Sequence, residues 1–277
     1  MRPAITVTVI ARDEAANIGR CVGSVRAWAQ EVIVVDSGSR DATRDIARAG
    51  GATVIEEAWR GYGAQKNLAA ERAAHDWILS LDADEEPTPE LLRAVDAAAA
   101  GDGGVGRLDP ARVYGFRRVT QFCGQWIRHG AWGRDRVWRL YHRARYRWDE
   151  RPVHESLAPA APRADVPAPR LLDGELLHYS YPDVASFERK REPYLALSVE
   201  ALRERGARPS ALHRRAAPAW RAFRGYVLQG GWRDGAAGRY LAASDYRMVR
   251  EKYARLEAAY RAEECDGGPR TGEDAPS

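Results

Sequence analysis

Short apolar runs alternate with amphipathic stretches along the first third of the chain. Runs rich in Val and Ile are typical of buried strands, and apolar residues that recur every three or four positions are typical of helices. The pattern predicts strands at 5–10, 31–36, 52–55 and 77–81, and helices at 18–28, 42–49 and 63–74. Regular alternation of strand and helix favours an α/β domain with a doubly wound, mostly parallel sheet.

The rest of the chain changes character from mixed to helical. The pattern predicts a helix at 89–100, strands at 113–120, 137–141 and 176–181, and helices at 184–205 and 218–229. Apolar residues between 246 and 260 then recur every three or four positions, which is typical of a helix face that packs. We therefore expect three parts: an α/β domain at 1–182, a helical C-terminal extension at 183–262, and a polar, disordered tail at 263–277.

The fourth predicted strand runs directly into a cluster of carboxylates. Asp82 and Asp84 follow the apolar run 77–81, and two glutamates come immediately after them. Parallel strands end at the crevice where α/β proteins bind ligands. Paired carboxylates at such a place favour a shared hard cation, Mg²⁺ or Mn²⁺. An isolated Asp-x-Asp is more often an acidic surface loop, but the apolar lead-in favours a binding site.

Composition limits the classes of protein to consider. The chain has 277 residues, of which 45% are apolar and 30% charged, as in a folded globular protein. No apolar run reaches the roughly 20 residues of a membrane-spanning helix. Three scattered cysteines and a start without signal-peptide character lead us to expect a protein of the reducing cytoplasm. The first strand is followed by Ala11-Arg12-Asp13-Glu14 rather than a glycine-rich turn, which disfavours a dinucleotide-dependent oxidoreductase.

Positive charge is concentrated near the C-terminus. The formal net charge is +4, yet residues 201–262 carry 14 Lys or Arg against 5 Asp or Glu. Within that segment, residues 220–233 mix arginines with Trp, Phe and Tyr. Two interpretations stay open: a solvated helix face with a core side, or a segment that attaches to an anionic membrane surface. A nucleic-acid partner is disfavoured because the remaining residues are net acidic.

Several motifs together resemble those of family 2 inverting glycosyltransferases of the GT-A fold. The first-half motifs are Val-Val-Asp-Ser-Gly-Ser at 34–39 and Leu-Asp-Ala-Asp-Glu at 81–85. The second-half motifs resemble those of the lipopolysaccharide core glucosyltransferases of the WaaE/KdtX type, and they occupy 124–130, 135–140, 153–155, 178–181 and 230–235. The resemblance extends from about Ile5 to Gly238.

The resemblance implies a role for each of eight residues. The nucleotide sugar would be bound by Glu14, Asp36, Lys66 and Asp82. Asp36 would accept a hydrogen bond from uracil, and Lys66 would help to offset the diphosphate charge. The metal would be bound by Asp84 and His178. Inversion also requires a base for the acceptor hydroxyl. We favour Glu155 as that base, with Asp135 as the alternative.

The resemblance therefore implies a metal-dependent hexosyltransferase that uses Mg²⁺ or Mn²⁺. The expected donor is a UDP-sugar, UDP-glucose first, and the expected acceptor is a membrane-linked saccharide such as the lipopolysaccharide inner core. We expect a cytoplasmic enzyme, peripheral on the inner face of the cytoplasmic membrane. Two alternatives remain: a family 2 enzyme with another acceptor (capsule glycan, lipid phosphate or peptide), and a non-catalytic nucleotide-sugar-binding scaffold.

Overall fold

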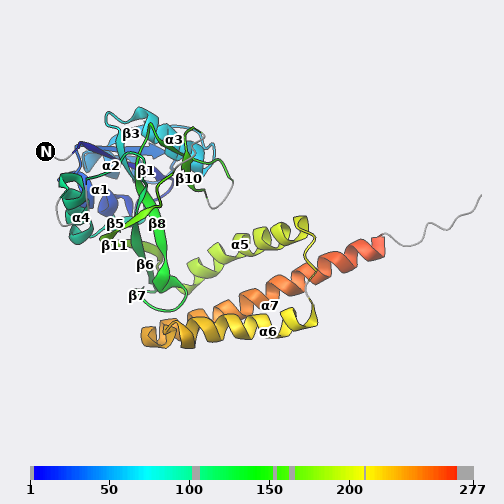
Figure 1. The fold of residues 1–277 in the computed structure, drawn as a ribbon. Coiled ribbons are helices and arrows are strands. Elements are labelled where there is room, and N and C mark those ends of the chain that lie inside the picture. Colours follow the sequence, from blue (N-terminus) through cyan, green and yellow to red (C-terminus); the bar gives the residue numbers. More distant parts are fainter. Residues whose placement is uncertain (1–2, 102–106, 152–154, 162–165, 209, 267–277) are drawn as a thin grey trace, which may run out of the picture. The chain divides into compact units, whose positions relative to one another are not determined.

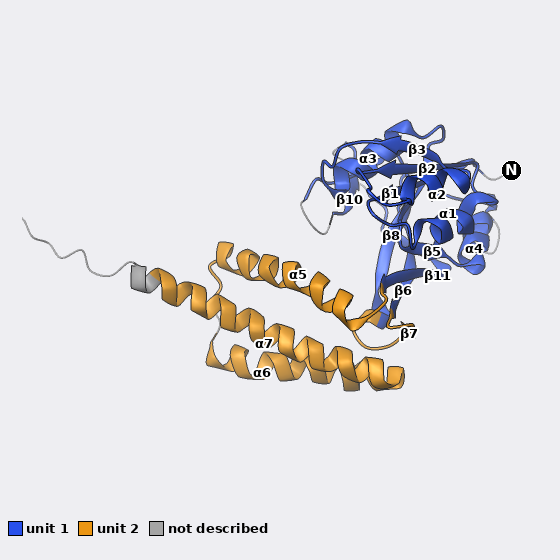
Figure 2. Ribbon diagram, turned by 180° about the vertical axis from the view of Figure 1, so that it is seen from behind, with its two compact units in different colours: residues 1–121, 133–180 blue, residues 122–132, 181–277 orange. Residues whose placement is uncertain are grey.

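The computed structural model describes residues 3–101, 107–151, 155–161, 166–208 and 210–266, and it divides into two compact units. Unit 1 comprises residues 1–121 and 133–180, and unit 2 comprises residues 122–132 and 181–277 (Figure 2). The segment 122–132 therefore belongs with the C-terminal helices, although it lies between two strands of unit 1 in the sequence.

The elements alternate in the first half and become helical at the end (Figure 1). Up to residue 100 the order is β1 (Ile5–Ala11), α1 (Ile18–Arg26), β2 (Glu31–Asp36), α2 (Thr43–Ala49), β3 (Thr53–Glu56), α3 (Tyr62–Arg72), β4 (Trp77–Asp82), β5 (Glu85–Pro87) and α4 (Pro89–Ala100). The middle of the chain contains β6 (Tyr114–Phe122), β7 (Gln125–Ile127), the 3₁₀ turn η1 (Trp132–Arg134), β8 (Arg136–His142), β9 (Tyr146–Trp148), β10 (Leu157–Pro159) and β11 (Arg170–Tyr181). The last third contains α5 (Val184–Glu204), α6 (Ala211–Phe223), the π-helical turn η2 (Arg224–Leu228), the 3₁₀ turn η3 (Gly231–Asp234) and α7 (Gly235–Asp266).

The main sheet has a parallel half and an antiparallel half. Its strand order is β3-β2-β1-β4-β8-β6-β11-β5. Strands β3, β2, β1 and β4 are parallel, whereas β4–β8, β8–β6 and β11–β5 pair antiparallel. The four predicted parallel strands are thus confirmed, and antiparallel strands extend the sheet beyond β4.

The parallel half is buried on both faces. In β2, Val32 and Val34 pack into one core with α1 and α4, while Ile33 and Val35 pack into a second core with α3. Side chains of successive strand residues point to opposite faces, so a run without polar interruption requires cover on both. Burial on both faces of the sheet therefore explains why these strands are continuous apolar runs in the sequence.

Helix α3 lies unusually close to the chain around β9. A Cβ on Gly63 would lie 1.9 Å from the carbonyl oxygen of Asp149, so only glycine permits this approach. One turn later, the Asn67 side-chain amide pairs with the backbone of Trp148, donating to its oxygen and accepting from its nitrogen at 2.9 Å each. These contacts fix α3 against β9, and they determine where the side chain of Lys66 lies.

Unit 2 is a helical assembly with its own small core. Phe122, Ile127, Phe187 and Ala237 are buried together, with the Phe122 and Phe187 rings edge to face at 5.4 Å. Farther along, Leu195 of α5 and Leu256 of α7 are also buried. Ion pairs join the same two helices, as between Arg255 and Glu192 at 2.6 Å.

The helix predicted at 218–229 has different bounds in the structure. Helix α6 begins at Ala211, capped by the hydroxyl of Ser210, and includes Pro218 in its interior before it passes into η2. Proline is favoured in a first helical turn, but Pro218 lies in the interior of α6. Helix α7 runs to Asp266, four residues into the predicted tail, while 267–277 lie outside the described residues. None of the described helices is both long enough and apolar enough to span a bilayer.

Candidate active site

The carboxylates singled out by the sequence lie at one edge of the sheet. In the strand register Asp36 is level with Ala11 of β1, and Asp82 is level with Ile10. Asp36 and Asp82 therefore flank the carboxyl end of β1 on either side, about 10 Å apart at two strand spacings. This edge is the expected ligand crevice of an α/β sheet.

Asp36 organises the turn that follows β2. It is fully buried, and its Oδ1 accepts hydrogen bonds from the backbone nitrogens of Gly38 at 3.1 Å and Ser39 at 2.9 Å. Its Oδ2 accepts a hydrogen bond from the Ser39 hydroxyl. In the same turn, Gln65 of α3 donates to the Ser37 hydroxyl at 2.8 Å. Three of the roughly four acceptor positions of the Asp36 carboxylate are thus used within its own turn.

Glu14 lies in the loop after β1, which is tied to the segment after β2. Its backbone nitrogen donates to the Thr43 hydroxyl at 2.8 Å, and its carboxylate accepts from the Asn17 amide at 2.8 Å. The preceding Asp13 has a φ of 53°, and its backbone nitrogen donates to the Ser39 hydroxyl at 2.9 Å. The two loops therefore form one connected rim beside Asp36.

Lys66 connects two of the predicted site residues. Its side chain is only 1% exposed, and its Nζ lies 2.7 Å from Oε1 of Glu155 and 3.1 Å from Oδ1 of Asp82. The ammonium also lies 4.6 Å from the centre of the Trp148 ring. Glu155 is thereby brought to the crevice, although 73 residues separate it from Asp82 in the sequence. Its neighbour His154 lies outside the described residues.

A buried arginine neutralises the carboxylates from the other side. Arg139 of β8, 5% exposed, donates from one nitrogen to Asp82 and to Glu85, the latter at 2.7 Å. Glu85 also accepts a hydrogen bond from the backbone nitrogen of Asp82 at 3.0 Å. Burial by itself would raise the pKa of Asp82, but the charges of Arg139 and Lys66 outweigh it and hold that pKa well below its ordinary value.

The same network continues to Asp135. Arg118 of β6 donates to Asp135 at 2.8 Å and lies 3.3 Å from Glu85. Burial opposes the charged guanidinium of Arg118, but the carboxylates of Glu85 and Asp135 prevail and raise its pKa. The site is therefore one chain of alternating charges, in the order Glu155, Lys66, Asp82, Arg139, Glu85, Arg118 and Asp135. The two candidate bases are its ends.

Asp84 and His178 form a separate pair on unit 1. Oδ2 of Asp84 lies 3.3 Å from Nε2 of His178, and the Thr120 hydroxyl lies 3.1 Å from the other ring nitrogen of His178. Two neighbouring ligands of an octahedral ion, each about 2.1 Å from it, lie about 3 Å apart, so this pair fits a divalent cation. Among the described residues no group of three or more such side chains forms a complete cage. Mg²⁺ commonly takes its other ligands from water and substrate phosphates, so two protein ligands are compatible with a substrate-completed site.

Sequence reasoning did not assign roles to Arg139, Glu85 or Asn67. Arg139 carries a readable signal, because it is a charged residue inside the otherwise apolar strand 137–141. Glu85 was visible only as one more acid behind Asp84. Asn67 gave no signal, since a polar residue on a helix is ordinarily solvated.

Comparisons with known proteins place the chain among sugar transferases. The model of Glycosyl transferase family 2 matches residues 6–155. The lipopolysaccharide core biosynthesis glycosyltransferase LpsC of Rhizobium meliloti is 30% identical over 268 residues, which cover 92% of this chain and 90% of that protein. An uncharacterized glycosyltransferase of Rickettsia felis is 48% identical over 92 residues, so the chain spans about a third of the length of that relative (33% of this chain, 32% of the relative). The solved glucosyl-3-phosphoglycerate synthase of Mycobacterium tuberculosis, in complex with Mn²⁺ and UDP, is 22% identical over 43% of this chain and 44% of that chain, with a TM-score of 0.35.

Proposed function

This chain belongs to glycosyl transferase family 2, and we propose that it transfers glucose from UDP-glucose, with inversion, to a membrane-linked saccharide of the lipopolysaccharide inner core. The acceptor class is suggested by the similarity to LpsC, which covers nearly the whole of both chains. The observation that carries the proposal is the meeting of Asp82 and Glu155 on one buried lysine at the ligand edge of the sheet.

The uridine is assigned to the rim formed by the loops after β1 and β2. Asp36 has one acceptor position left on its carboxylate, which suits the N3–H of uracil. Because Asp36 has no exposed surface, this contact requires neighbouring side chains to move aside. Glu14, in the adjoining loop, supports the same binding region through its link to Thr43.

The diphosphate is assigned to the region of Asp82, Asp84 and Lys66. Asp84 and His178 would hold Mg²⁺ or Mn²⁺, and the bound ion supplies positive charge against the leaving UDP. Lys66 adds a fixed positive charge close to Asp82. Lys66 and Arg139 both pair with Asp82 in the structure, which reduces the repulsion between this carboxylate and the donor diphosphate.

Glu155 is proposed to accept the proton of the attacking acceptor hydroxyl. The acceptor oxygen forms a bond to the anomeric carbon, the bond from that carbon to the diphosphate oxygen breaks, and UDP leaves with the electron pair. Attack from the face opposite UDP inverts the anomeric configuration. Glu155 is favoured over Asp135 because Lys66 links it directly to Asp82, whereas Asp135 is reached only through Arg118, Glu85 and Arg139.

The test is a donor panel on the purified chain. UDP or GDP release is measured from UDP-glucose, UDP-galactose, UDP-N-acetylglucosamine and GDP-mannose, with purified core saccharide as acceptor, in Mn²⁺ and in chelator. The proposal predicts metal-dependent release from UDP-glucose and a β-linked product. Release that is equally fast in chelator would contradict the metal role, and UDP binding without any release would favour the scaffold alternative.

A further inference from the structure

Unit 2 carries a surface on which large apolar side chains and arginines are exposed together. We name it the aromatic–arginine surface, and it is formed by α6, η2 and η3. Its apolar members, 47% to 57% exposed, are Trp220, Phe223, Val227, Leu228 and Trp232. Its basic members are Arg224 and Arg233, and Arg239 of α7 is exposed beside them.

Three of the apolar members form a continuous stripe. Residues 220, 223 and 227 are three and four apart, so they share one side of the helix that runs from α6 into η2. The ring centres of Trp220 and Phe223 lie 6.0 Å apart. Isolated exposed apolar residues are ordinary, but a contiguous exposed group marks an interaction surface.

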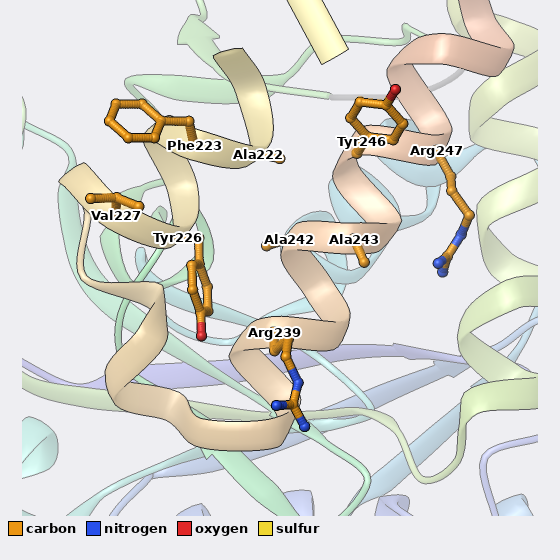
Figure 3. A pocket seen from close by; sticks show the side chains of 9 residues that line it. All are labelled: Ala222, Phe223, Tyr226, Val227, Arg239, Ala242, Ala243, Tyr246 and Arg247. Carbon is orange, nitrogen blue, oxygen red and sulfur yellow. The ribbon is translucent and has the colours of Figure 1, made fainter. Parts of the chain in front are cut away.

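A groove adjoins the stripe (Figure 3). It has a volume of about 440 Å³ and lies between α6–η2 on one side and α7 on the other. Phe223 and Val227 contribute to one wall and Tyr246 to the other, while Arg239 and Arg247 also border the groove. The lining is therefore almost entirely apolar, with cationic groups at its border.

Positive charge predominates along this segment. Residues 211–247 include seven arginines and two aspartates. Neither aspartate offers a free negative charge: Asp234 is buried and accepts hydrogen bonds from His129, and Asp245 is paired with Arg221 at 3.1 Å. The partner of this surface must therefore present negative charge next to an apolar phase.

We propose that the aromatic–arginine surface docks on an anionic phospholipid bilayer, with its five exposed apolar side chains, Trp232 included, in the acyl boundary and the arginines at the phosphates. Trp side chains and arginines both favour the interface between headgroups and acyl chains. A second copy of this chain would bring like charges together, and Val227 and Leu228 have no ring to stack on a nucleic-acid base. This inference does not depend on the donor or the acceptor proposed above.

The test is co-sedimentation of the full chain with vesicles. Vesicles of phosphatidylcholine mixed with phosphatidylglycerol are compared with vesicles of phosphatidylcholine alone. The surface predicts binding to the anionic vesicles only, weakened by salt. Replacing Arg224 and Arg233 by Gln should weaken binding about 25-fold, at about fivefold for each arginine near an anionic surface. Replacing Trp220 and Trp232 by Ser should weaken it by about tenfold or more.

Matched controls separate the surface from general exposure. Leu197→Ser removes a similarly exposed apolar side chain from α5, and Arg261→Gln removes an exposed arginine from α7. Both should bind vesicles as the unmodified chain does. The melting temperature of all four variants should equal that of the unmodified chain, which shows that they fold and keeps this test apart from that of the transferase activity.

Four outcomes would overturn the proposal. These are no binding to anionic vesicles, equal binding by the Trp variant, a dimer in solution that the Trp variant abolishes, and tight binding to single-stranded nucleic acid in place of vesicles.

Discussion

Replacing Arg139 by Met tests the charge network at the centre of the site. Arg139 is almost fully buried and forms ion pairs with both Asp82 and Glu85. Met is unbranched and has no charge, so it leaves a buried Glu85 with the partly exposed Arg118 as its nearest cation. Removing one member of a buried ion pair costs about 3–5 kcal/mol, because the remaining charge is left uncompensated.

The expected loss in the free energy of unfolding at pH 7 is therefore about 3–5 kcal/mol, or roughly 10 °C in melting temperature for a chain of this size. Its pH dependence has a definite sign. In the unmodified chain the pKa of Asp82 lies below its ordinary value, so Asp82 contributes stability above about pH 4 that is lost as the pH falls. In the variant Arg139 no longer lowers the pKa of Asp82, so this contribution is smaller and the difference between the two proteins should shrink as the pH falls below about 4.

Urea unfolding at several pH values measures this effect. The matched control is Arg147→Met on β9, whose ion pair with Glu71 is exposed on both sides, and it should change stability by no more than about 0.5 kcal/mol. Adding Glu85→Gln to Arg139→Met should recover part of the loss, since one buried charge is then removed. An Arg139→Met protein within about 1 kcal/mol of the unmodified chain at pH 7 would refute the reasoning.

Three further predictions concern other parts of unit 1. Asp84→Ala should abolish the rise in melting temperature that Mn²⁺ gives in the presence of UDP, and His178→Ala should reduce it; an undiminished rise in Asp84→Ala would move the metal elsewhere. Gly174→Ala should lose about 2–3 kcal/mol in urea unfolding, because Gly174 has a φ of +89° and a Cβ would lie 2.3 Å from the backbone nitrogen of Leu91; a neutral result would mean that α4 shifts freely. Thr88→Ala should lose about 1 kcal/mol, because the Thr88 hydroxyl caps α4 by accepting from Leu91 at 3.3 Å, and Thr88→Ser should retain most of the stability if the cap is the cause.

The parallel half of the fold could be predicted because its signals are local. Each run such as 31–36 is apolar on both faces, and each ends in the residue that reaches the ligand edge. The structure confirms the fold class and the helical C-terminal extension, and the match of the family model confirms the family. Asp36 and Asp82 are the last residues of their strands, so assigning the strands was enough to predict that both lie at the ligand edge of the sheet.

The charge network could not be predicted in the same way. Lys66 meets Glu155 only because Gly63 and Asn67 bring α3 against β9. Neither a close backbone approach nor a hydrogen bond between an amide side chain and the backbone leaves a periodic pattern in the sequence. The antiparallel order β8-β6-β11-β5 depends on long-range pairing for the same reason. The roles of the eight site residues remain predictions, now with defined contacts for each.

The most direct test of the account compares the two ends of the charge network. Turnover of UDP-glucose with core saccharide is measured for the unmodified chain, Glu155→Gln and Asp135→Asn, each checked for folding by its melting temperature. We expect a loss of turnover of at least about 100-fold in Glu155→Gln, with UDP binding retained, and a much smaller loss in Asp135→Asn. Full turnover in Glu155→Gln together with loss in Asp135→Asn would contradict the account and assign the base to Asp135.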